Sequence, residues 1–419
     1  MAAWPTKRMD DLCEITSSKR IFAADYVSEG VPFYRGREIT EKYKGNLDVS
    51  TELFITEEKF AAIERKFGAP ILGDLLLTSV GTLGSVYVVK AGDRFYFKDG
   101  NLTWFRNFKG LDSNFLYYWI GSPQGKAELQ KCTIGSSQSA FTIVLLKGIE
   151  IELPPVPVQQ RIAVILSAYD ELIENSQRRI KILESMARGL YREWFVHFRF
   201  PGHENHPRVA SALGAIPEGW AVKEMQEIAD VIDCLHSKKP AECEGGHGIL
   251  LQLNNIGEGG KLDMREQFRV SAEDYRLWIS RIELRFGDCV VTNVGRVGAV
   301  AQIPEGVVAA PGRNMTAIRA RTGKLTPTYL IEYLLSPHMT SEVAKRKDLG
   351  TIMDSLNVKG IIRLQVPCPP YEVMQRFDEA VRPIRRRIEL LVQQIQNLRR
   401  TRDLLLPRLL SGQIEVEAT

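Results

Sequence analysis

Apolar residues recur at alternating spacings of four and three in two long segments that lack glycine-rich turns. The first series consists of Ile162, Leu166, Tyr169, Ile173, Ser176, Ile180, Leu183, Ala187, Leu190 and Trp194. The second, shifted by about 215 residues, consists of Phe377, Val381, Ile384, Ile388, Leu391, Ile395, Leu398, Arg402, Leu405 and Leu409. Such spacing over several heptads is typical of the seam of a left-handed coiled coil. It predicts two long helices, over residues 155–199 and 370–411.

The two predicted helices most simply pack on each other. The alternative is that each is an ordinary amphipathic helix on its own domain, but a narrow apolar seam favours another helix over a broad sheet. Antiparallel packing would place the domains that precede the helices at opposite ends of a spacer, and parallel packing would crowd them together. Pro383 lies inside the second pattern and predicts a kink or a restart there, while Pro407 predicts the end of the pattern.

The regions that precede the two helices repeat each other. Residues 73–86 read GDLLLTSVGTLGSV and residues 287–300 read GDCVVTNVGRVGAV, so the offset is 214. Asn101 similarly matches Asn314, and Pro154-Pro155 matches Pro369-Pro370. A unit this long exceeds the period of solenoids and propellers, and indicates a duplicated domain. The predicted fold is mixed α/β: a tandem α+β domain, each copy followed by a long helix, with the helices pairing as an antiparallel coiled coil.

The repeat also sets the predicted domain boundaries. A chain of 419 residues suits two or three domains. We predict two globular domains, over residues 1–154 and 217–369, and two long helices, over residues 155–199 and 370–411. Residues 200–216 form the predicted linker, and residues 412–419 form the tail.

The glycine-rich strings predict a strand, a tight turn and a second strand. Short apolar strands end at Thr78 and Thr292, and the glycines that follow supply positive φ or close backbone approach. One interpretation is a purely structural hairpin turn. The other is a backbone surface held against a ligand, with polar side chains at its tip: Thr78, Ser79, Thr82, Asn293 and Arg296.

Composition is that of a globular protein, with 44% hydrophobic and 25% charged residues. The six cysteines are scattered without paired spacing, which favours reduced intracellular thiols. No apolar run has the length of a signal peptide or a membrane span, so we expect a cytoplasmic protein. The net charge of +4 permits nucleic-acid binding without requiring it.

Enzyme signatures are absent or imperfect. The stretch 121–127, GSPQGKA, lacks the spacing of a phosphate-binding loop. Residues 368–371, CPPY, resemble the motif of amino-directed DNA methyltransferases, but a thiol is a poor hydrogen-bond acceptor for the target amino group. His197, His203 and His206 lie in an expected loop without metal-site spacing. We therefore predict no catalytic residues, no metal and no cofactor.

Several strings, in order along the whole chain, resemble the specificity subunits of type I restriction–modification systems. They are the two glycine-rich strings, PPVPVQQRIAVIL (154–166), WFVHFRFPGHE (194–204), AIPEGW (215–220) and RDLLLPRLLSGQI (402–414). The first copy lacks an IPEGW-like opening and has only Trp4-Pro5, so its beginning is less sharply marked.

This resemblance implies a non-catalytic DNA reader. Two target recognition domains would each read one half of a bipartite, asymmetric site in double-stranded DNA. The paired helices would separate these domains and dock two copies of a methyltransferase subunit, to which restriction or translocase subunits add. Leu172, Met186 and Tyr191 lie beside the seam of the first helix and are candidates for the partner-binding face.

Candidate DNA-binding side chains are polar and basic residues near the expected turns. Arginine favours guanine and asparagine favours adenine in the major groove, although any one candidate could be an ordinary surface residue. Besides the tip residues named above, the first domain offers Arg35, Arg37, Lys42, Lys44, Lys98 and Asn101, and the second offers Asn254, Asn255, Arg313 and Asn314.

Two other functional classes stay open at the level of sequence. One is a free-standing, two-headed DNA-binding regulator without methyltransferase partners. The other is an enzyme with its own methyl-transfer or nuclease chemistry, which would need a cofactor motif that the chain does not display.

Overall fold

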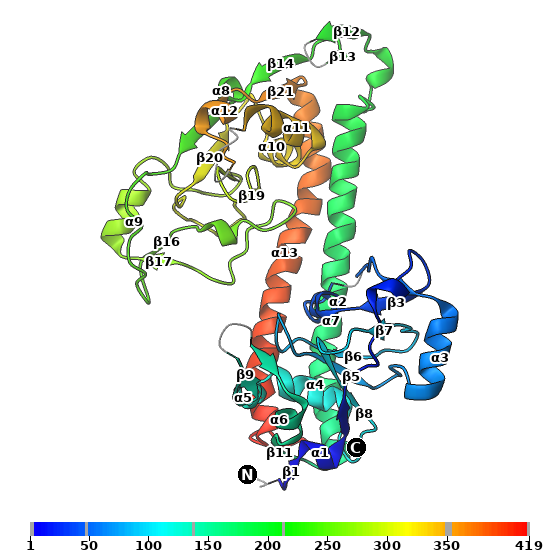
Figure 1. The fold of residues 1–419 in the computed structure, drawn as a ribbon. Coiled ribbons are helices and arrows are strands. Elements are labelled where there is room, and N and C mark those ends of the chain that lie inside the picture. Colours follow the sequence, from blue (N-terminus) through cyan, green and yellow to red (C-terminus); the bar gives the residue numbers. More distant parts are fainter. Residues whose placement is uncertain (1–3, 47–48, 136–138, 212–213, 348–353, 417–419) are drawn as a thin grey trace. The chain divides into compact units, whose positions relative to one another are not determined.

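A computed structural model describes residues 4–46, 49–135, 139–211, 214–347 and 354–416 (Figure 1). The chain forms two compact units. The first comprises Met1–Asn175 and Asn397–Thr419, and the second comprises Ser176–Gln396. Each unit therefore contains one globular head and parts of both long helices. No helix in the described part of the chain is long and apolar enough to cross a membrane.

The first head is built on strands β2 (Glu14–Thr16), β5 (Leu75–Thr78), β6 (Val86–Val88) and β8 (Leu102–Arg106). They form an antiparallel sheet in the order β2-β8-β5-β6. A smaller sheet has the order β4-β3-β7 and consists of β3 (Val31–Tyr34), β4 (Phe54–Ile55) and β7 (Tyr96–Phe97). Two further strand pairs are β1 (Thr6–Arg8) with β11 (Glu150–Glu152), and β9 (Thr133–Ile134) with β10 (Ala140–Phe141).

Helices cover and connect these strands. They are α1 (Met9–Leu12), η1 (Ala23–Asp25), α2 (Gly36–Tyr43), α3 (Glu57–Phe67), α4 (Ser113–Gly121), α5 (Pro123–Lys131) and α6 (Ile143–Lys147). Side-chain oxygens that cap the first backbone N–H groups fix where four of them begin, because those N–H groups have no partner within a helix. The capping residues are Thr56 for α3, Asp112 for α4, Ser122 for α5 and Thr142 for α6.

The second head repeats this plan. Its strands β15 (Ala229–Asp233), β18 (Cys289–Thr292), β19 (Val300–Gln302) and β20 (Met315–Ala320) form a sheet in the order β15-β20-β18-β19. Strand β14 (Ala221–Glu224) pairs with β21 (Gln365–Cys368), and β16 (Gly248–Ile249) pairs with β17 (Arg269–Val270). The helices are α8 (Met225–Ile228), η4 (Leu253–Asn255), α9 (Ala272–Trp278), α10 (Pro327–Leu334), α11 (Pro337–Arg346) and α12 (Val358–Ile362).

The two four-stranded sheets confirm the predicted duplication. Strands β5 and β18, which carry the repeated strings, occupy the same place in their sheets. The capping residues also correspond: Ser122 caps α5 as Ser336 caps α11, and Thr142 caps α6 as Asn357 caps α12. A difference is that α2 of the first head is replaced by the short 3-10 turn η4 in the second.

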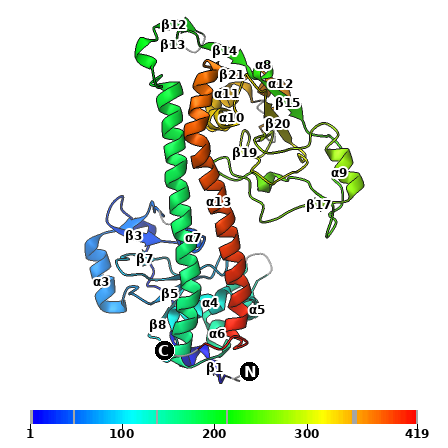
Figure 2. The ribbon, with the colours of Figure 1, turned by 180° about the vertical axis from the view of Figure 1, so that it is seen from behind.

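The two long helices are α7 (Val156–Tyr191) and α13 (Tyr371–Leu410). In the first unit the beginning of α7 shares a core with the end of α13, where Ile162 and Leu166 belong to the same cluster as Leu406 and Leu409. In the second unit the end of α7 meets the beginning of α13, and the rings of Tyr191 and Phe377 lie 6.3 Å apart. Within each unit the segments of the two helices therefore pair antiparallel (Figures 1 and 2).

Burial along these helices follows the apolar spacing. Every residue of the two seam series is buried or half-buried. At its C-terminal end α7 passes into a π-helical turn, η2 (Arg192–Val196), whose Phe195 contacts Phe377 and Tyr329 at ring separations of 4.8 and 4.7 Å. This aromatic cluster fastens the second head to both helices of its unit.

The predicted restart at Pro383 is wrong, because α13 continues through Pro383 and also through Pro407. Proline removes one backbone donor from the helix. Pro383 and Glu379, whose carbonyl loses that donor, are both exposed, so water can satisfy the carbonyl. The seam residues Val381 and Ile388 on either side are buried and hold the helix in register.

The region predicted as a linker, residues 200–216, contains some regular structure. It holds the 3-10 turn η3 (His203–Asn205), β12 (Arg208–Ser211) and the beginning of β13 (Gly214–Pro217), and β12 pairs with β13. Its residues 212–213, like residues 417–419 of the predicted tail, lie outside the described residues.

Candidate nucleic-acid interface

The Gly-Asp pair that opens each repeated string forms a structural turn. The carboxylate of Asp74 accepts a hydrogen bond from the backbone N–H of Ile71 at 3.0 Å, and Asp288 accepts one from Arg285 at 2.9 Å. The preceding glycines have φ of 88° and 86°, a conformation that side chains disfavour. Asp74 also accepts from the Trp104 indole at 2.9 Å. Burial raises the pKa of the Asp74 carboxyl, and these two hydrogen bonds partly offset that effect.

Thr78 and Thr292 hold the glycine loops that follow. The Thr78 hydroxyl accepts from the backbone N–H of Ser85 at 2.8 Å, and the Thr292 hydroxyl accepts from Ala299 at 3.1 Å. Their backbone groups also match, since Gly84 donates to the Thr78 carbonyl at 3.0 Å and Gly298 to the Thr292 carbonyl at 2.9 Å. The threonine of each string therefore closes a loop of six residues, 79–84 in the first head and 293–298 in the second. Thr78 is fully buried, so we withdraw it from the DNA-binding set.

Ser79 and Asn293 tie each loop to its neighbours. Their backbone N–H groups donate to the carbonyls of Asn101 and Asn314, each at 2.8 Å. The Ser79 hydroxyl lies 2.7 Å from that of Thr103, and the Asn293 amide donates to the carbonyl of Leu356 at 2.6 Å. Ser79 is buried and Asn293 is committed to the protein, so we withdraw both side chains as DNA contacts.

The loop tips themselves are exposed. Gly81, Thr82, Gly295 and Arg296 are all accessible, and a Cβ atom built on Gly81 or Gly295 would meet nothing within 4 Å. Arg296 reaches back and donates a hydrogen bond to the carbonyl of Ile256. The threonine and glycines build the turn, as the structural interpretation expects, and the exposed tip carries different side chains in the two heads. The interpretation of the tip as a ligand-binding surface stays a prediction.

The basic candidate residues in and around α2 differ in how exposed their side chains are. Arg37 and Lys44 are exposed, whereas Lys42 is only 16% exposed and its ammonium lies 4.8 Å from the centre of the Tyr87 ring. Lys42 is thus a packing residue with a cation–π contact, and we withdraw it. Arg35 is half-buried beside the fully buried Glu38, whose carboxylate accepts from the Arg35 backbone N–H at 2.8 Å.

The other candidate DNA-binding residues also include both buried and exposed side chains. Asn255 is buried and donates to the carbonyls of Asp263 and Glu266, both at 2.8 Å, so it is structural and we withdraw it. Asn101 is half-buried and contributes its carbonyl to the loop. The remaining exposed candidates are Lys98 in the first head and Asn254, Arg313 and Asn314 in the second.

Sequence reasoning missed the polar contacts that fix each head to its helices. In the first unit, Tyr118 of α4 donates to Asp170 of α7 at 2.7 Å, and Arg402 of α13 pairs with the same carboxylate. In the second unit, Arg385 of α13 pairs with the fully buried Glu332 of α10, with Nε 2.7 Å from Oε1. Arg402 is the one charged residue in the otherwise apolar seam series of α13. Its presence there was the sequence signal for the ion pair with Asp170.

Burial also changes which residues of the first long helix are assigned to the expected partner-binding face. Leu172 and Met186 are exposed by 49% and 50%, as expected for a surface that a partner covers. Tyr191 is 4% exposed and packs in the aromatic cluster of the second unit, so it is not part of such a face. Ile182, at 55% exposure and one turn before Met186, takes its place.

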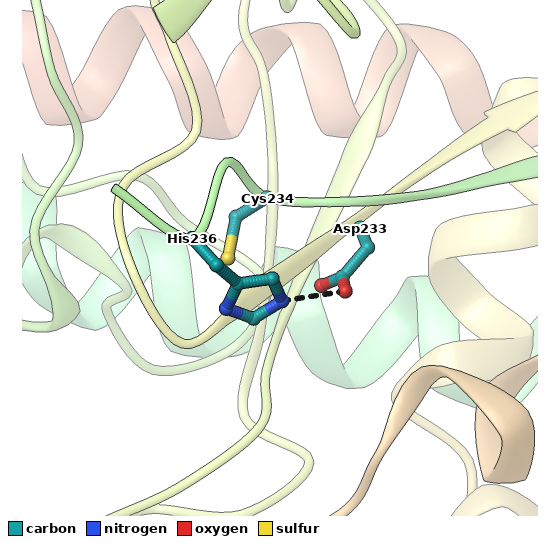
Figure 3. A group of neighbouring side chains, drawn as sticks. All are labelled: Asp233, Cys234 and His236. Atoms are coloured by element: carbon teal, nitrogen blue, oxygen red, sulfur yellow. Dashed lines mark hydrogen bonds and ion pairs between the residues drawn. The ribbon is translucent and has the colours of Figure 1, made fainter.

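One group among the described residues could in principle hold a metal ion: Asp233, Cys234 and His236, at the end of β15 (Figure 3). Its His236 Nε2 and Asp233 Oδ2 lie 2.7 Å apart and already satisfy each other. Burial raises the pKa of the Cys234 thiol, which opposes formation of the thiolate that a metal requires. These contacts are those of a local polar cluster at the end of β15.

The stretch 368–371 contains a buried, hydrogen-bonded cysteine. Cys368 is buried at the end of β21, its thiol donates to the carbonyl of Val366, and burial raises its pKa to about 12. The prolines that follow precede the start of α13, consistent with their role as a stop before a helix. His203 and His206 of the linker contact the backbone carbonyls of Phe200 and Gly202.

Comparisons with known proteins agree with this architecture. Residues 1–185 match the type I restriction modification DNA specificity domain family. The MjaIX specificity subunit of a type I restriction enzyme of Methanocaldococcus jannaschii is 26% identical, covering 99% of this chain and 94% of the relative. A Haemophilus influenzae relative, a putative specificity subunit, is 28% identical over 45% of this chain and 47% of its own length. A solved S subunit from M. genitalium superposes with a TM-score of 0.59 at 16% identity, covering 97% of this chain and 96% of that one.

Proposed function

We propose that this chain, which belongs to the family of type I restriction–modification specificity subunits, reads a bipartite, asymmetric DNA site with its two heads and docks two methyltransferase subunits. Restriction or translocase subunits would join through those partners. Recognition of DNA sequence is the function of the family, and the division of labour between the heads is our inference.

This proposal rests on one observation about the two glycine-rich loops. The hydrogen bonds that close the loops are the same in both heads, whereas the side chains at the loop tips differ. Thr78 and Thr292 close the two loops with the same hydrogen bonds, while the tips carry Thr82 in one head and Arg296 in the other. A common frame positions both tips alike, and unlike tips can contact unlike bases. Two similar but unequal readers fit a site with two different halves.

The surface that we propose for DNA contact lies around these tips. It consists of the exposed candidates Arg37, Lys44, Thr82, Lys98, Asn254, Arg296, Arg313 and Asn314. Arg35 and Asn101 are half-buried and would contribute at its edge. Basic side chains in this set would neutralise phosphates, and arginine or asparagine side chains that reach the major groove would discriminate bases.

The helices supply the second part of the proposal. Exposed apolar side chains on α7, namely Val164, Leu172, Ile182 and Met186, lie away from the buried seam. Apolar surface of this kind on a helix is typical of a protein-binding face. We therefore assign methyltransferase docking to the outer side of α7, and we expect the isolated chain to be poorly soluble or to bind DNA weakly.

The test is co-expression of the chain with the methyltransferase encoded beside it, followed by mass determination and methylation mapping by sequencing. The proposal predicts a complex of one specificity subunit and two methyltransferases that modifies one two-part motif. A monodisperse chain that binds its site with nanomolar affinity and ignores the methyltransferase would instead identify a free-standing regulator. Methylation by the purified chain alone would identify an enzyme.

A further inference from the structure

The second unit contains a basic cavity of about 540 Å³ that the sequence did not reveal. It lies where the end of α11, the short helix α12 and strands β14 and β21 come together. The residues on which the argument depends are Glu224, Lys345, Arg346, Lys359, Gly360 and Arg363. Four of these six carry positive charge and one carries negative charge.

A buried carboxylate organises one wall of this cavity. Glu342 is 2% exposed and pairs with Lys345 at 3.2 Å and with Arg346 at 2.6 Å. It also accepts a hydrogen bond from the Gln365 backbone N–H at 3.1 Å. Two cations thus share one acid, which leaves an excess of positive charge at the rim.

Two further cations, Lys359 and Arg363, line the cavity. Among the residues that the structure describes, Lys359 and Arg363 form no ion pair, and both are exposed. Glu224 is the acidic side chain in the cavity lining. Counting Glu342 and Glu224 against the four cations leaves a net charge of about +2, which favours an anionic ligand.

The duplicated head allows the residues of this cavity to be compared with those at the equivalent positions of the first head. Helices α6 and α12 are equivalent, with capping residues Thr142 and Asn357. Within that frame Val144 is replaced by Lys359, Leu145 by Gly360, and Gly148 by Arg363, at an offset of 215. Val144 is 80% exposed. Lys147 of the first head is in turn replaced by Ile362 at the same offset.

Gly360 lies in the cavity lining and is closely packed against its neighbours. A Cβ atom at this position would lie 3.0 Å from Leu356 Cδ1 and 3.5 Å from the Arg346 backbone carbonyl. A leucine side chain, as at the equivalent Leu145, would occupy the region beside Arg346. Along this helix the second head has therefore gained two cations, Lys359 and Arg363, and lost one, at Ile362.

We propose that this cavity holds a phosphate group of the DNA backbone beside the half-site that the second head reads. The inference rests on the proposed function. Two copies of one methyltransferase would require surfaces that both heads share, whereas two different DNA halves can contact different surfaces. The cavity differs between the heads, and its charge matches phosphate. Its contacts add affinity without base discrimination.

The experiment uses the full chain in its complex with the methyltransferase and measures the affinity for the mapped DNA site across a range of salt concentrations. Lys359→Val and Gly360→Leu each install the residue of the first head; one removes charge and the other fills the space. Lys126→Val, at an exposed lysine of α5 in the first unit, is the matched control for loss of one charge. Thermal unfolding of each complex confirms that the variants fold.

Loss of one phosphate contact should lower the slope of log affinity against log salt by about 1, with the methylated motif unchanged. We expect this for Lys359→Val and Gly360→Leu and not for Lys126→Val. Native affinity and slope in both cavity variants would overturn the inference. Loss of methyltransferase from the complex would also overturn it and would assign the cavity to a protein partner.

A final arm distinguishes DNA phosphate from free phosphate. Inorganic phosphate is compared with sulfate and chloride at equal ionic strength for its ability to weaken DNA binding by the native complex and by Gly360→Leu. A DNA-phosphate site predicts that all cavity variants bind DNA less tightly in chloride alone. Normal DNA binding by the variants, together with loss of a specific phosphate effect, would make the cavity a free-anion site instead. Failure of the native complex to bind or methylate any two-part motif would reject the proposed function itself.

Discussion

Asp170 of α7 and Arg402 of α13 form an ion pair that joins the two long helices within the first unit. The same carboxylate accepts a hydrogen bond from Tyr118, so one acid connects both helices to the head. Arg402 also contacts Asp403, with Nη2 2.8 Å from Oδ1. Because the two partners of the pair are about 70% covered, removal of one leaves the other partly desolvated and without its counter-charge.

Arg402→Ala should therefore lower the free energy of unfolding by about 1.5–3 kcal/mol. The change is measured by denaturant unfolding of the full chain in its complex. Arg408→Ala, at an exposed position of the same helix, is the control and should have little effect. A double-mutant cycle with Asp170→Asn should show coupling between the two sites, and strict additivity would mean that the ion pair contributes nothing.

The buried seam between the two long helices can be tested with one acidic substitution in α13 and one in α7. Leu391 is 1% exposed, and Leu391→Asp loses burial worth about 1.5–3 kcal/mol and adds the cost of a buried carboxylate. Leu183 is half-buried, so Leu183→Asp should cost less. Calorimetry of the complex measures both effects.

Leu172→Asp is the matched control for the seam, because Leu172 is 49% exposed on α7. This variant should keep its stability and lose methyltransferase, as measured by the mass of the co-expressed complex. Full stability in Leu391→Asp would contradict the coiled-coil assignment, and unchanged methyltransferase binding in Leu172→Asp would contradict the assigned partner face.

Exchange of residues 217–369 for the equivalent domain of a relative should change one half of the methylated motif. The other half and the spacing should survive, because the proposal assigns half-sites to the heads and spacing to the helices. Methylation sequencing of cells that carry the chimaera and the methyltransferase measures all three quantities. A change in both halves, or in neither, would refute independent heads.

A fragment that ends near residue 200 carries one head and one complete seam, and we expect it to pair antiparallel with a second copy. With the methyltransferase it should then modify a palindrome made of the first half-site and its inverted repeat. In such a dimer Asp170 would have no cationic partner, because the repeat places Ala187 where α13 has Arg402.

Ala187→Arg in the fragment should therefore restore an ion pair with Asp170 at both symmetric positions and tighten the dimer, as measured by sedimentation. Equal dimerisation by both fragments would argue against that role for Asp170.

Glu342 provides a pH-dependent prediction. Burial by itself would raise the pKa of this carboxyl, but the Gln365 N–H, Lys345 and Arg346 outweigh it and hold the pKa below its usual range. A carboxyl with a depressed folded-state pKa stabilises the fold above its unfolded-state pKa of about 4.3, and this stability is lost as the pH falls through the folded-state value. Glu342→Gln should flatten that acid-side loss in thermal unfolding. An unchanged pH profile would exclude Glu342 as its source.

The sequence by itself determined the repeated architecture. The spacing of residues such as Ile162, Leu166 and Ile173 is a property of consecutive positions, so it identified the helices before any tertiary contact was known. The recurrence of the string at 73–86 and 287–300 required only comparison of the chain with itself. The tandem heads and the paired helices follow from these two one-dimensional patterns.

Tertiary structure decided what individual polar residues do. Ser79 and Lys42 looked like surface residues near turns, but Thr103 and Tyr87, distant in the sequence, take up their polar groups. The basic cavity likewise forms where β14 and β21 meet α11 and α12, and its lining includes Glu224, Arg346 and Lys359. The residues that form these hydrogen bonds and line this cavity come from segments far apart along the chain. A periodic or repeated sequence pattern does not indicate which distant segments will contact each other.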